Sequence, residues 1–167
     1  IDGHNDILAR GWENKDFDFV RGKNTGHLDL EDALEAGFAG GLFAIFIPPA
    51  EAEKKRQRSF GDGLSTPGTV PTERALRVAF AMFSRLRRYG EASGGRFRLA
   101  RSAGELRKAV EDGEHVAALC HIEGAEPFDR DLAALDLFYE AGLRSLGIVW
   151  SRTNRFGTGV PFAFNRS

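Results

Sequence analysis

The sequence predicts an α/β fold built on parallel strands, and two observations carry this prediction. Continuous apolar runs recur along the chain, as expected of strands that are buried on both faces. Between these runs lie segments whose apolar residues recur at helical spacing, so strands and helices alternate. The length of 167 residues fits one domain, and on length alone a doubly wound sheet fits better than a β/α barrel of about 250 residues.

Four strands are expected. Residues 1–4 resemble the tail of a strand, and the β-prone run 40–47 is closed by two prolines. The run 115–122 ends at Glu123 and Gly124, and the run 143–150 supplies the last strand.

Four helices are expected between these strands. Residues 29–36 begin at the potential N-cap Asp29, and residues 71–89 open with a proline at the first helical position. Residues 102–111 begin with a capping box, in which Glu105 follows Ser102 by three residues, and residues 129–141 end at a glycine. The polar, glycine-rich stretch 51–70 predicts a long loop.

Composition excludes several function classes. The net charge of −1, with both signs interspersed, argues against nucleic acid and membrane surfaces as partners. One cysteine excludes an internal disulfide framework, and no apolar run reaches the ~18 residues of a membrane span. Phosphate-binding loops, dinucleotide fingerprints and serine-hydrolase elbows are absent from the sequence.

The chain begins with Ile1 rather than Met, so we expect its natural N-terminus to be missing, and we favour a cytoplasmic location.

The triplet from His4 to Asp6 stands at the end of the first expected strand. Side chains two residues apart on extended backbone share a face, so an imidazole and a carboxylate can converge on one cation. Nitrogen and oxygen ligands suit zinc or a similar divalent metal. His-x-Asp triplets are common by chance, and the alternative is a hydrogen-bonded loop histidine followed by a helix-capping aspartate.

Glu123 follows a buried strand directly, at the edge where parallel α/β folds bind ligands. His121 shares its face and is either a partner of a metal ligand or a satisfied core histidine. Cys120 points the other way and is expected to fill the core. The polar stretch 151–155 lies at the same edge and either binds substrate or forms a solvated loop, whereas His27 is expected to be buried or to cap a helix.

Taken together, these segments resemble the membrane (renal) dipeptidase family of binuclear zinc peptidases. The likeness runs in order over essentially the whole chain. It consists of DGHND at 2–6, HLDL at 27–30, GFAGGLFAIFIP at 37–48, HIEGAE at 121–126 and LDLFYEAGLRSL at 135–146.

The resemblance implies a β/α (TIM-type) barrel of the metal-dependent hydrolase kind, of which residues 1–167 are the N-terminal half of one catalytic domain. It implies two zinc ions, with His4 and Asp6 binding the first and Glu123 bridging both. The expected reaction is hydrolysis of the peptide bond of a dipeptide, including L-Xaa-D-Xaa, by a metal-bridged hydroxide. We also expect a homodimer.

Two departures from the family pattern affect these expectations. Several functional groups of the family are expected beyond Ser167: the two histidines of the second metal site, the proton-shuttling aspartate and a carboxylate-binding arginine. This fragment alone should therefore be inactive. Well-known members carry a substrate-binding histidine where this chain has Trp150, so Trp150, Ser151 and Arg152 are expected to shape the pocket instead. Two alternative functions stay open. One is a different amidohydrolase that acts on a non-peptide amide or an N-acyl amino acid, and the other is a non-catalytic remnant.

Overall fold

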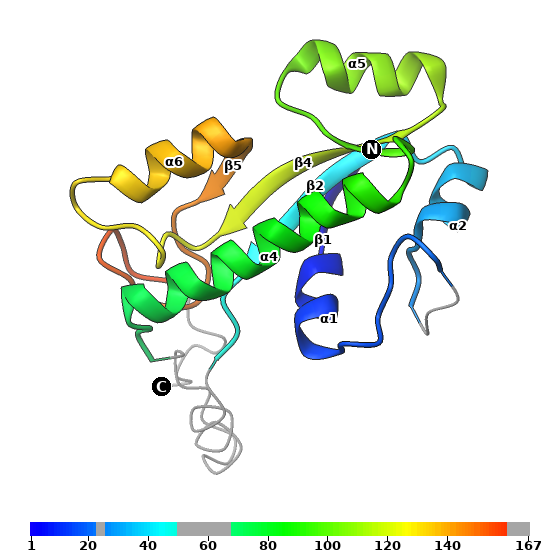
Figure 1. Cartoon of the computed structure of the whole chain (residues 1–167). Helices are drawn as coiled ribbons and strands as arrows, with labels where there is room; N and C mark the ends of the chain where they lie inside the picture. Colours follow the sequence, from blue (N-terminus) through cyan, green and yellow to red (C-terminus); the bar gives the residue numbers. More distant parts are fainter. Residues whose placement is uncertain (23–25, 50–67, 160–167) are drawn as a thin grey trace, which may run out of the picture.

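A computed structural model describes residues 1–22, 26–49 and 68–159. Its strands are β1 (Asp2–Asn5), β2 (Gly40–Phe46), β3 (Phe97–Leu99), β4 (Val116–Glu123) and β5 (Leu143–Gly147). Its helices are α1 (Ile7–Glu13), α2 (Leu30–Glu35), α4 (Thr72–Ala92), α5 (Ala103–Asp112) and α6 (Ala133–Ala141). At least one helix separates each strand from the next along the chain, in keeping with the predicted α/β pattern (Figure 1).

All pairings in the sheet are parallel, and β4 pairs with three other strands. Strand β2 pairs with β1 on one side and with β4 on the other, in a register that sets Phe46 beside Glu123. Strand β3 pairs with the first part of β4, whereas β5 pairs with the last part and sets Gly147 beside Glu123. Parallel pairing brings the carboxyl ends of β1, β2, β4 and β5 to one edge of the sheet.

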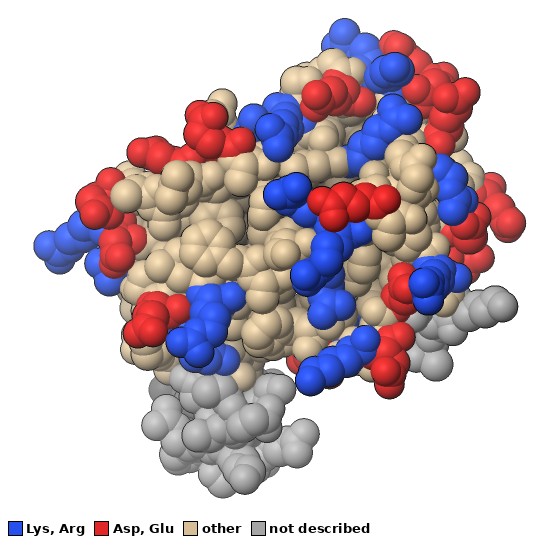
Figure 2. All heavy atoms as spheres, in the orientation of Figure 1, with Lys and Arg blue, Asp and Glu red and all other residues tan. Residues whose placement is uncertain are grey.

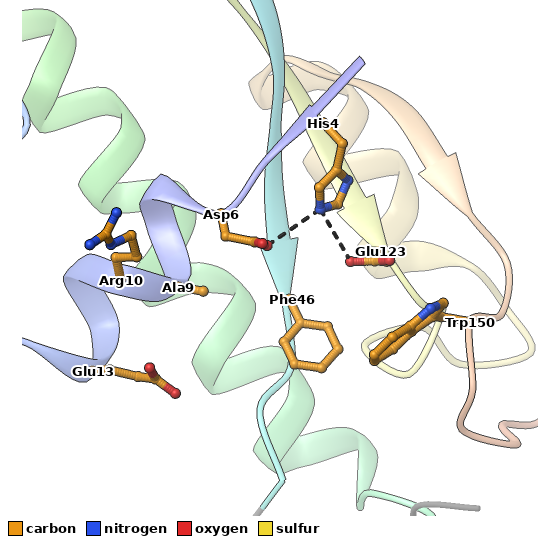
Figure 3. Close-up of a pocket in the computed structure, with 8 residues that line it drawn as sticks. All are labelled: His4, Asp6, Ala9, Arg10, Glu13, Phe46, Glu123 and Trp150. Carbon is orange, nitrogen blue, oxygen red and sulfur yellow. Dashed lines mark hydrogen bonds and ion pairs between the residues drawn. The ribbon is translucent and has the colours of Figure 1, made fainter. Parts of the chain in front are cut away.

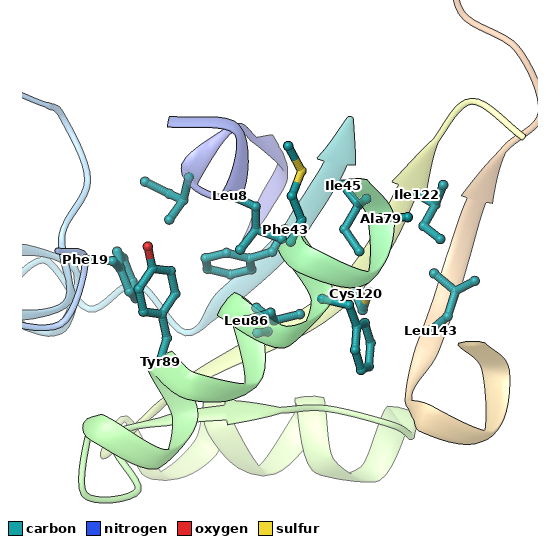
Figure 4. Close-up of a cluster of buried hydrophobic side chains, with 14 of the residues drawn as sticks. Leu8, Phe19, Phe43, Ile45, Ala79, Leu86, Tyr89, Cys120, Ile122 and Leu143 are labelled. Atoms are coloured by element: carbon teal, nitrogen blue, oxygen red, sulfur yellow. The ribbon is translucent and has the colours of Figure 1, made fainter. Parts of the chain in front are cut away.

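The two faces of β4 have different surroundings. Ala118, Cys120 and Ile122 belong to the main core, which the long helix α4 covers (Figures 1 and 4). Aromatic side chains fill this core, and Phe43 and Phe97 meet edge to face with their centroids 5.0 Å apart. Ala117 faces the other way and packs with α5, so His121 and Glu123, which follow at even spacing, share that opposite face.

Local signals in the sequence explain where two helices begin. The Asp29 side chain accepts a hydrogen bond from the Asp32 amide at the start of α2. The predicted capping box opens α5, since Ser102 and Glu105 each bond the other's backbone amide. Helix α6 starts at Ala133, later than the predicted residue 129, because Leu132 adopts a left-handed conformation with φ 59°.

Two elements and one strand end differ from the predictions. Strand β3 was not predicted, and a helix after Asp6, which the structure shows as α1, entered only through the alternative in which Asp6 caps a helix. The last strand ends at Gly147 and not at residue 150, so the chain turns away from the sheet before Trp150. Most of the predicted loop 51–70 lies outside the described residues.

Positive and negative side chains are interspersed over the face drawn in Figure 2, and neither sign forms a continuous patch there. Among the helices of the described residues, none is both long enough and apolar enough to cross a lipid bilayer.

Candidate metal centre

His4 and Asp6 lie together where β1 passes into α1. The Nε2 atom of His4 is 3.3 Å from Oδ1 of Asp6. Asp2 supports this turn, because its carboxylate accepts hydrogen bonds from the His4 amide and from the Asn5 side chain. Asp6 occupies the N-cap position of α1, yet its side chain makes no capping hydrogen bond and is therefore available to a ligand.

Glu123 reaches the same point from the end of β4. Its Oε2 atom lies 3.7 Å from Nε2 of His4, so the imidazole nitrogen faces two carboxylates at once (Figure 3). Strand β2 separates β1 from β4, and the side chains meet across its end. The sheet thus brings together three residues that the sequence places as much as 119 positions apart.

These three side chains fit a divalent cation. Each offers one ligand atom, and the three atoms all lie within 4.8 Å of one another. One imidazole nitrogen and two carboxylate oxygens form a donor set that zinc accepts, and they leave coordination positions open as catalytic sites require.

The electrostatics of the group also favour a positive charge. Burial raises the pKa of Glu123, His4 opposes this shift, and the carboxylates of Asp6 and Glu126 raise the pKa further. Burial and the two neighbouring carboxylates thus disfavour the ionised form of Glu123, and a cation bound at its ligand atoms would favour that form.

His121 lies next to the metal group without belonging to it. Its Nδ1 atom is 2.9 Å from the Ser145 hydroxyl, and its ring meets the His4 ring edge to face at 6.1 Å. Burial lowers the pKa of His121, and the proximity of His4 lowers it further. Since Ser145 belongs to β5, this contact links β5 to His121, whose ring lies beside that of His4.

The metal group opens into a pocket of about 350 Å³. Its wall includes Phe46 and Trp150, and helix α1 contributes Ala9, Arg10 and Glu13 (Figure 3). The α1 residues recur at positions three and four apart, so they form one helix face together with Asp6. Phe46, Arg10 and Glu13 were not predicted as site residues. A helix after Asp6 would have placed Arg10 and Glu13 on the same face as Asp6.

Of the three residues expected to shape the pocket, one lines it and the other two are buried. Trp150 lines it, and its ring stands edge to face against Phe46 at 5.5 Å. Ser151 and Arg152 are buried, and Arg152 donates a hydrogen bond to the carbonyl of Ile47. Substrate contact by these three residues stays a prediction.

Two other sequence expectations concern single residues. Cys120 is fully buried in the core, as predicted. His27 is exposed rather than buried, and the capping residue of α2 is Asp29, so the expectation for His27 is wrong.

The structure therefore combines a parallel α/β sheet with a His-Asp-Glu group at the carboxyl ends of its strands, whose ligand atoms could hold a metal ion. The family described as membrane dipeptidase (peptidase family M19) matches residues 1–163, and the chain belongs to this family. The resemblance found in the sequence motifs is therefore confirmed.

Two curated bacterial proteins are similar to the chain. The "Uncharacterized protein in PQQ-III 3'region" of Acinetobacter calcoaceticus is 33% identical over 173 residues, which cover 100% of this chain and 53% of that protein. The "Uncharacterized protein in pqqA 5'region" of Klebsiella pneumoniae is 46% identical over 72 residues, which cover 43% of this chain and 26% of that protein.

Two solved structures extend the likeness to three dimensions. A dipeptidase AC, described as a metallopeptidase of family M19, is 44% identical with a TM-score of 0.85, and the match covers 99% of this chain and 48% of that one. A metallopeptidase from Rhodobacter sphaeroides, described as liganded with a phosphinate mimic of the dipeptide L-Ala-D-Ala, is 43% identical with a TM-score of 0.86, and the match covers 99% and 49%.

The chain spans about half the length of the Acinetobacter calcoaceticus protein and of the two solved structures. Its parallel sheet is consistent with part of the TIM-type barrel of the dipeptidase family, and the barrel implied by the motifs is favoured over the doubly wound sheet that length alone suggested. A metallopeptidase family also implies a metal cofactor.

Proposed function

We propose that residues 1–167 form the N-terminal half of a single catalytic β/α barrel domain, and that the full-length protein is a zinc-dependent dipeptidase. The observation that carries this proposal is the group formed by His4, Asp6 and Glu123, whose ligand atoms lie within 4.8 Å of one another. Its position at the carboxyl edge of the parallel strands supports a catalytic role, because barrel enzymes build their active sites there.

His4 and Asp6 would hold the first of two zinc ions, and Glu123 would bridge it to the second. When bound, such cations lower the pKa of a coordinated water toward neutrality and polarise the scissile carbonyl. The remaining ligands of the second ion, and the groups that transfer protons, are expected from parts of the protein beyond Ser167.

The pocket residues would bind and orient the substrate. The rings of Phe46 and Trp150 form an apolar wall on one side of the site, beside Glu123. Arg10 and Glu13 place both signs of charge on the α1 wall, and a dipeptide likewise carries a carboxylate and an ammonium group. The dipeptide mimic described in the Rhodobacter sphaeroides protein supports a dipeptide substrate, and we infer that a D-residue is accepted on its C-terminal side.

Trp150 favours a second candidate function. It stands where the family resemblance leads us to expect a substrate-binding histidine, and an indole cannot polarise a carbonyl as an imidazolium can. An amidohydrolase that cleaves another amide or an N-acyl amino acid at the same metal centre fits this replacement.

Turnover by the full-length protein tests the proposal. Zinc-loaded enzyme is assayed on L-Ala-D-Ala, L-Ala-L-Ala and N-acetyl-D-Ala, before and after the metal is removed by chelation. We expect the two dipeptides to be hydrolysed only with metal present, with the L,D-dipeptide accepted. Hydrolysis of the N-acyl compound alone favours the second candidate, and no turnover of any compound favours a non-catalytic remnant.

Glu123→Gln tests the role of the bridging carboxylate. It should lower kcat/KM at least about 100-fold, because even changes outside the ligands of a metal site cost 10–100-fold. Glu114→Gln is the matched control, because Glu114 is exposed just before the opposite end of the same strand, and it should retain full activity.

A further inference from the structure

A buried arginine connects the loops that follow three neighbouring strands. Arg152 lies in the segment after β5 and is 4% exposed, and Glu126 lies in the segment after β4 and is 7% exposed. Nη1 of Arg152 donates to the Ile47 carbonyl, just beyond β2, at 3.0 Å and lies 3.5 Å from Oε1 of Glu126. One guanidinium therefore contacts the ends of β2 and β4 from the end of β5.

Stability alone does not account for this pair. Charges buried away from water are costly, and replacing a buried ion pair with apolar residues is often neutral or stabilising. Among the described residues, Oε2 of Glu126, Nε of Arg152 and the Ser151 hydroxyl have no hydrogen-bond partner. Burial also raises the pKa of Glu126, against the opposing effect of Arg152. The pair of Arg152 and Glu126 is therefore better suited to holding the loops that it connects in one arrangement than to stabilising the folded state.

The geometry that the pair fixes is that of the proposed substrate pocket. Ile47 directly follows Phe46, and Trp150 precedes Arg152 by two residues, so the pair is anchored beside both aromatic rings of the pocket wall. The guanidinium carbon itself lies 6.0 Å from the centroid of the Phe46 ring. On the other side, the Glu126 carboxylate packs against Gly124, the residue that follows Glu123.

We propose that Arg152 and Glu126 form a clamp that positions Trp150 against Phe46, and thereby sets the shape of the pocket beside Glu123. In this proposal Arg152 is a positioning residue that acts through Trp150, in place of the direct substrate contact expected from the sequence. This inference rests on the proposed peptidase function only for its kinetic consequences, since the position of Trp150 can be measured without any turnover.

The test uses the full-length protein labelled with 5-fluorotryptophan, in which Trp150→Phe assigns the ¹⁹F resonance of Trp150. The variants Arg152→Lys and Glu126→Gln conserve size and weaken the clamp, because lysine cannot reproduce the fork of a guanidinium. Both should shift or broaden the Trp150 resonance. Arg155→Lys is the matched control: Arg155 is exposed in the same loop, pairs with the exposed Asp129, and should leave the resonance unchanged.

Kinetics then separate positioning from direct substrate contact. Arg152→Lys should raise KM for the dipeptide about tenfold, with a smaller change in kcat, whereas metal content stays that of the parent protein. In a Trp150→Ala background the same substitution should change KM less than about threefold, because the residue through which it acts is gone.

Two results would overturn the clamp. One is an unchanged Trp150 resonance in folded Arg152→Lys and Glu126→Gln proteins. The other is an effect of Arg152→Lys on KM that stays the same in the Trp150→Ala background, which indicates direct contact with substrate. A parent protein that hydrolyses no dipeptide refutes the proposed function, whereas the ¹⁹F comparison still decides whether the clamp positions Trp150.

Discussion

Gly124 follows the proposed bridging ligand, and replacing it with alanine should be unusually costly. Its backbone has φ +97°, a conformation that side chains other than glycine rarely adopt. A Cβ at this position would overlap Oε2 of Glu126 and lie 3.0 Å from its Cδ. The Glu126 side chain is buried beside Arg152, so it cannot move aside into solvent.

Two terms set the magnitude. The positive φ costs on the order of 1–3 kcal/mol for a residue with a Cβ. Crowding in a packed interior adds on the order of 1–3 kcal/mol. We therefore expect Gly124→Ala to lower the free energy of unfolding by about 3 kcal/mol or more, and to lower kcat/KM because Glu123 is displaced.

Gly113→Ala provides the matched control. Gly113 also has a positive φ, of +64°, but no heavy atom lies within 4 Å of the added Cβ, so only the conformational cost of about 1–2 kcal/mol applies. Urea unfolding of both variants in the full-length protein measures the difference. Equal losses in the two variants would refute the crowding beside Glu126, and with it the packing described for the segment after β4.

Three further predictions follow from the core and the helix ends. Ser102→Ala removes half of the capping box with Glu105 and should cost about 1 kcal/mol, measured as a lower urea midpoint, whereas Ser102→Asp should restore it. Phe97→Ala empties a fully buried site against Phe43 and should cost about 3–5 kcal/mol by the same assay; a loss below about 1 kcal/mol contradicts the packing. Burial raises the pKa of Cys120 to about 12, so iodoacetamide at pH 8 should leave this thiol unmodified in the native protein and alkylate it in urea, as peptide mass mapping will report. Because the folded-state pKa exceeds the ordinary value of 9.0, the stability contributed by Cys120 is complete below pH 9 and is lost as the pH rises toward 12.

The long strands could be predicted from the sequence because each is a continuous apolar run. Strands β2 and β4 begin and end within one residue of the predicted ranges 40–47 and 115–122. Strand β3 was missed because three residues are too few to show a pattern, and α1, with seven residues, was expected only in the alternative in which Asp6 caps a helix. The late start of α6 depends on the left-handed Leu132, which helix propensity does not indicate.

The convergence of His4, Asp6 and Glu123 could also be predicted from the sequence, whereas their role as metal ligands stays a prediction. His4 and Asp6 are neighbours in sequence, and Glu123 stands at a strand end, so simple rules of sheet geometry point to all three. Phe46 was missed because its apolar side chain was interpreted as part of a strand core. The pairing of Glu126 with Arg152 depends on how the loops after β4 and β5 fold against β2, which no local pattern records.

The most direct test of the metal centre is anomalous X-ray diffraction from crystals of the full-length protein grown with zinc and measured at the zinc absorption edge. We expect an anomalous peak about 2 Å from a ring nitrogen of His4 and from carboxylate oxygens of Asp6 and Glu123. The peak should disappear in Glu123→Gln crystals and persist in Glu114→Gln crystals. Zinc bound elsewhere, with these three side chains left uncoordinated, would contradict the assignment of the site and the hydrolytic function proposed from it.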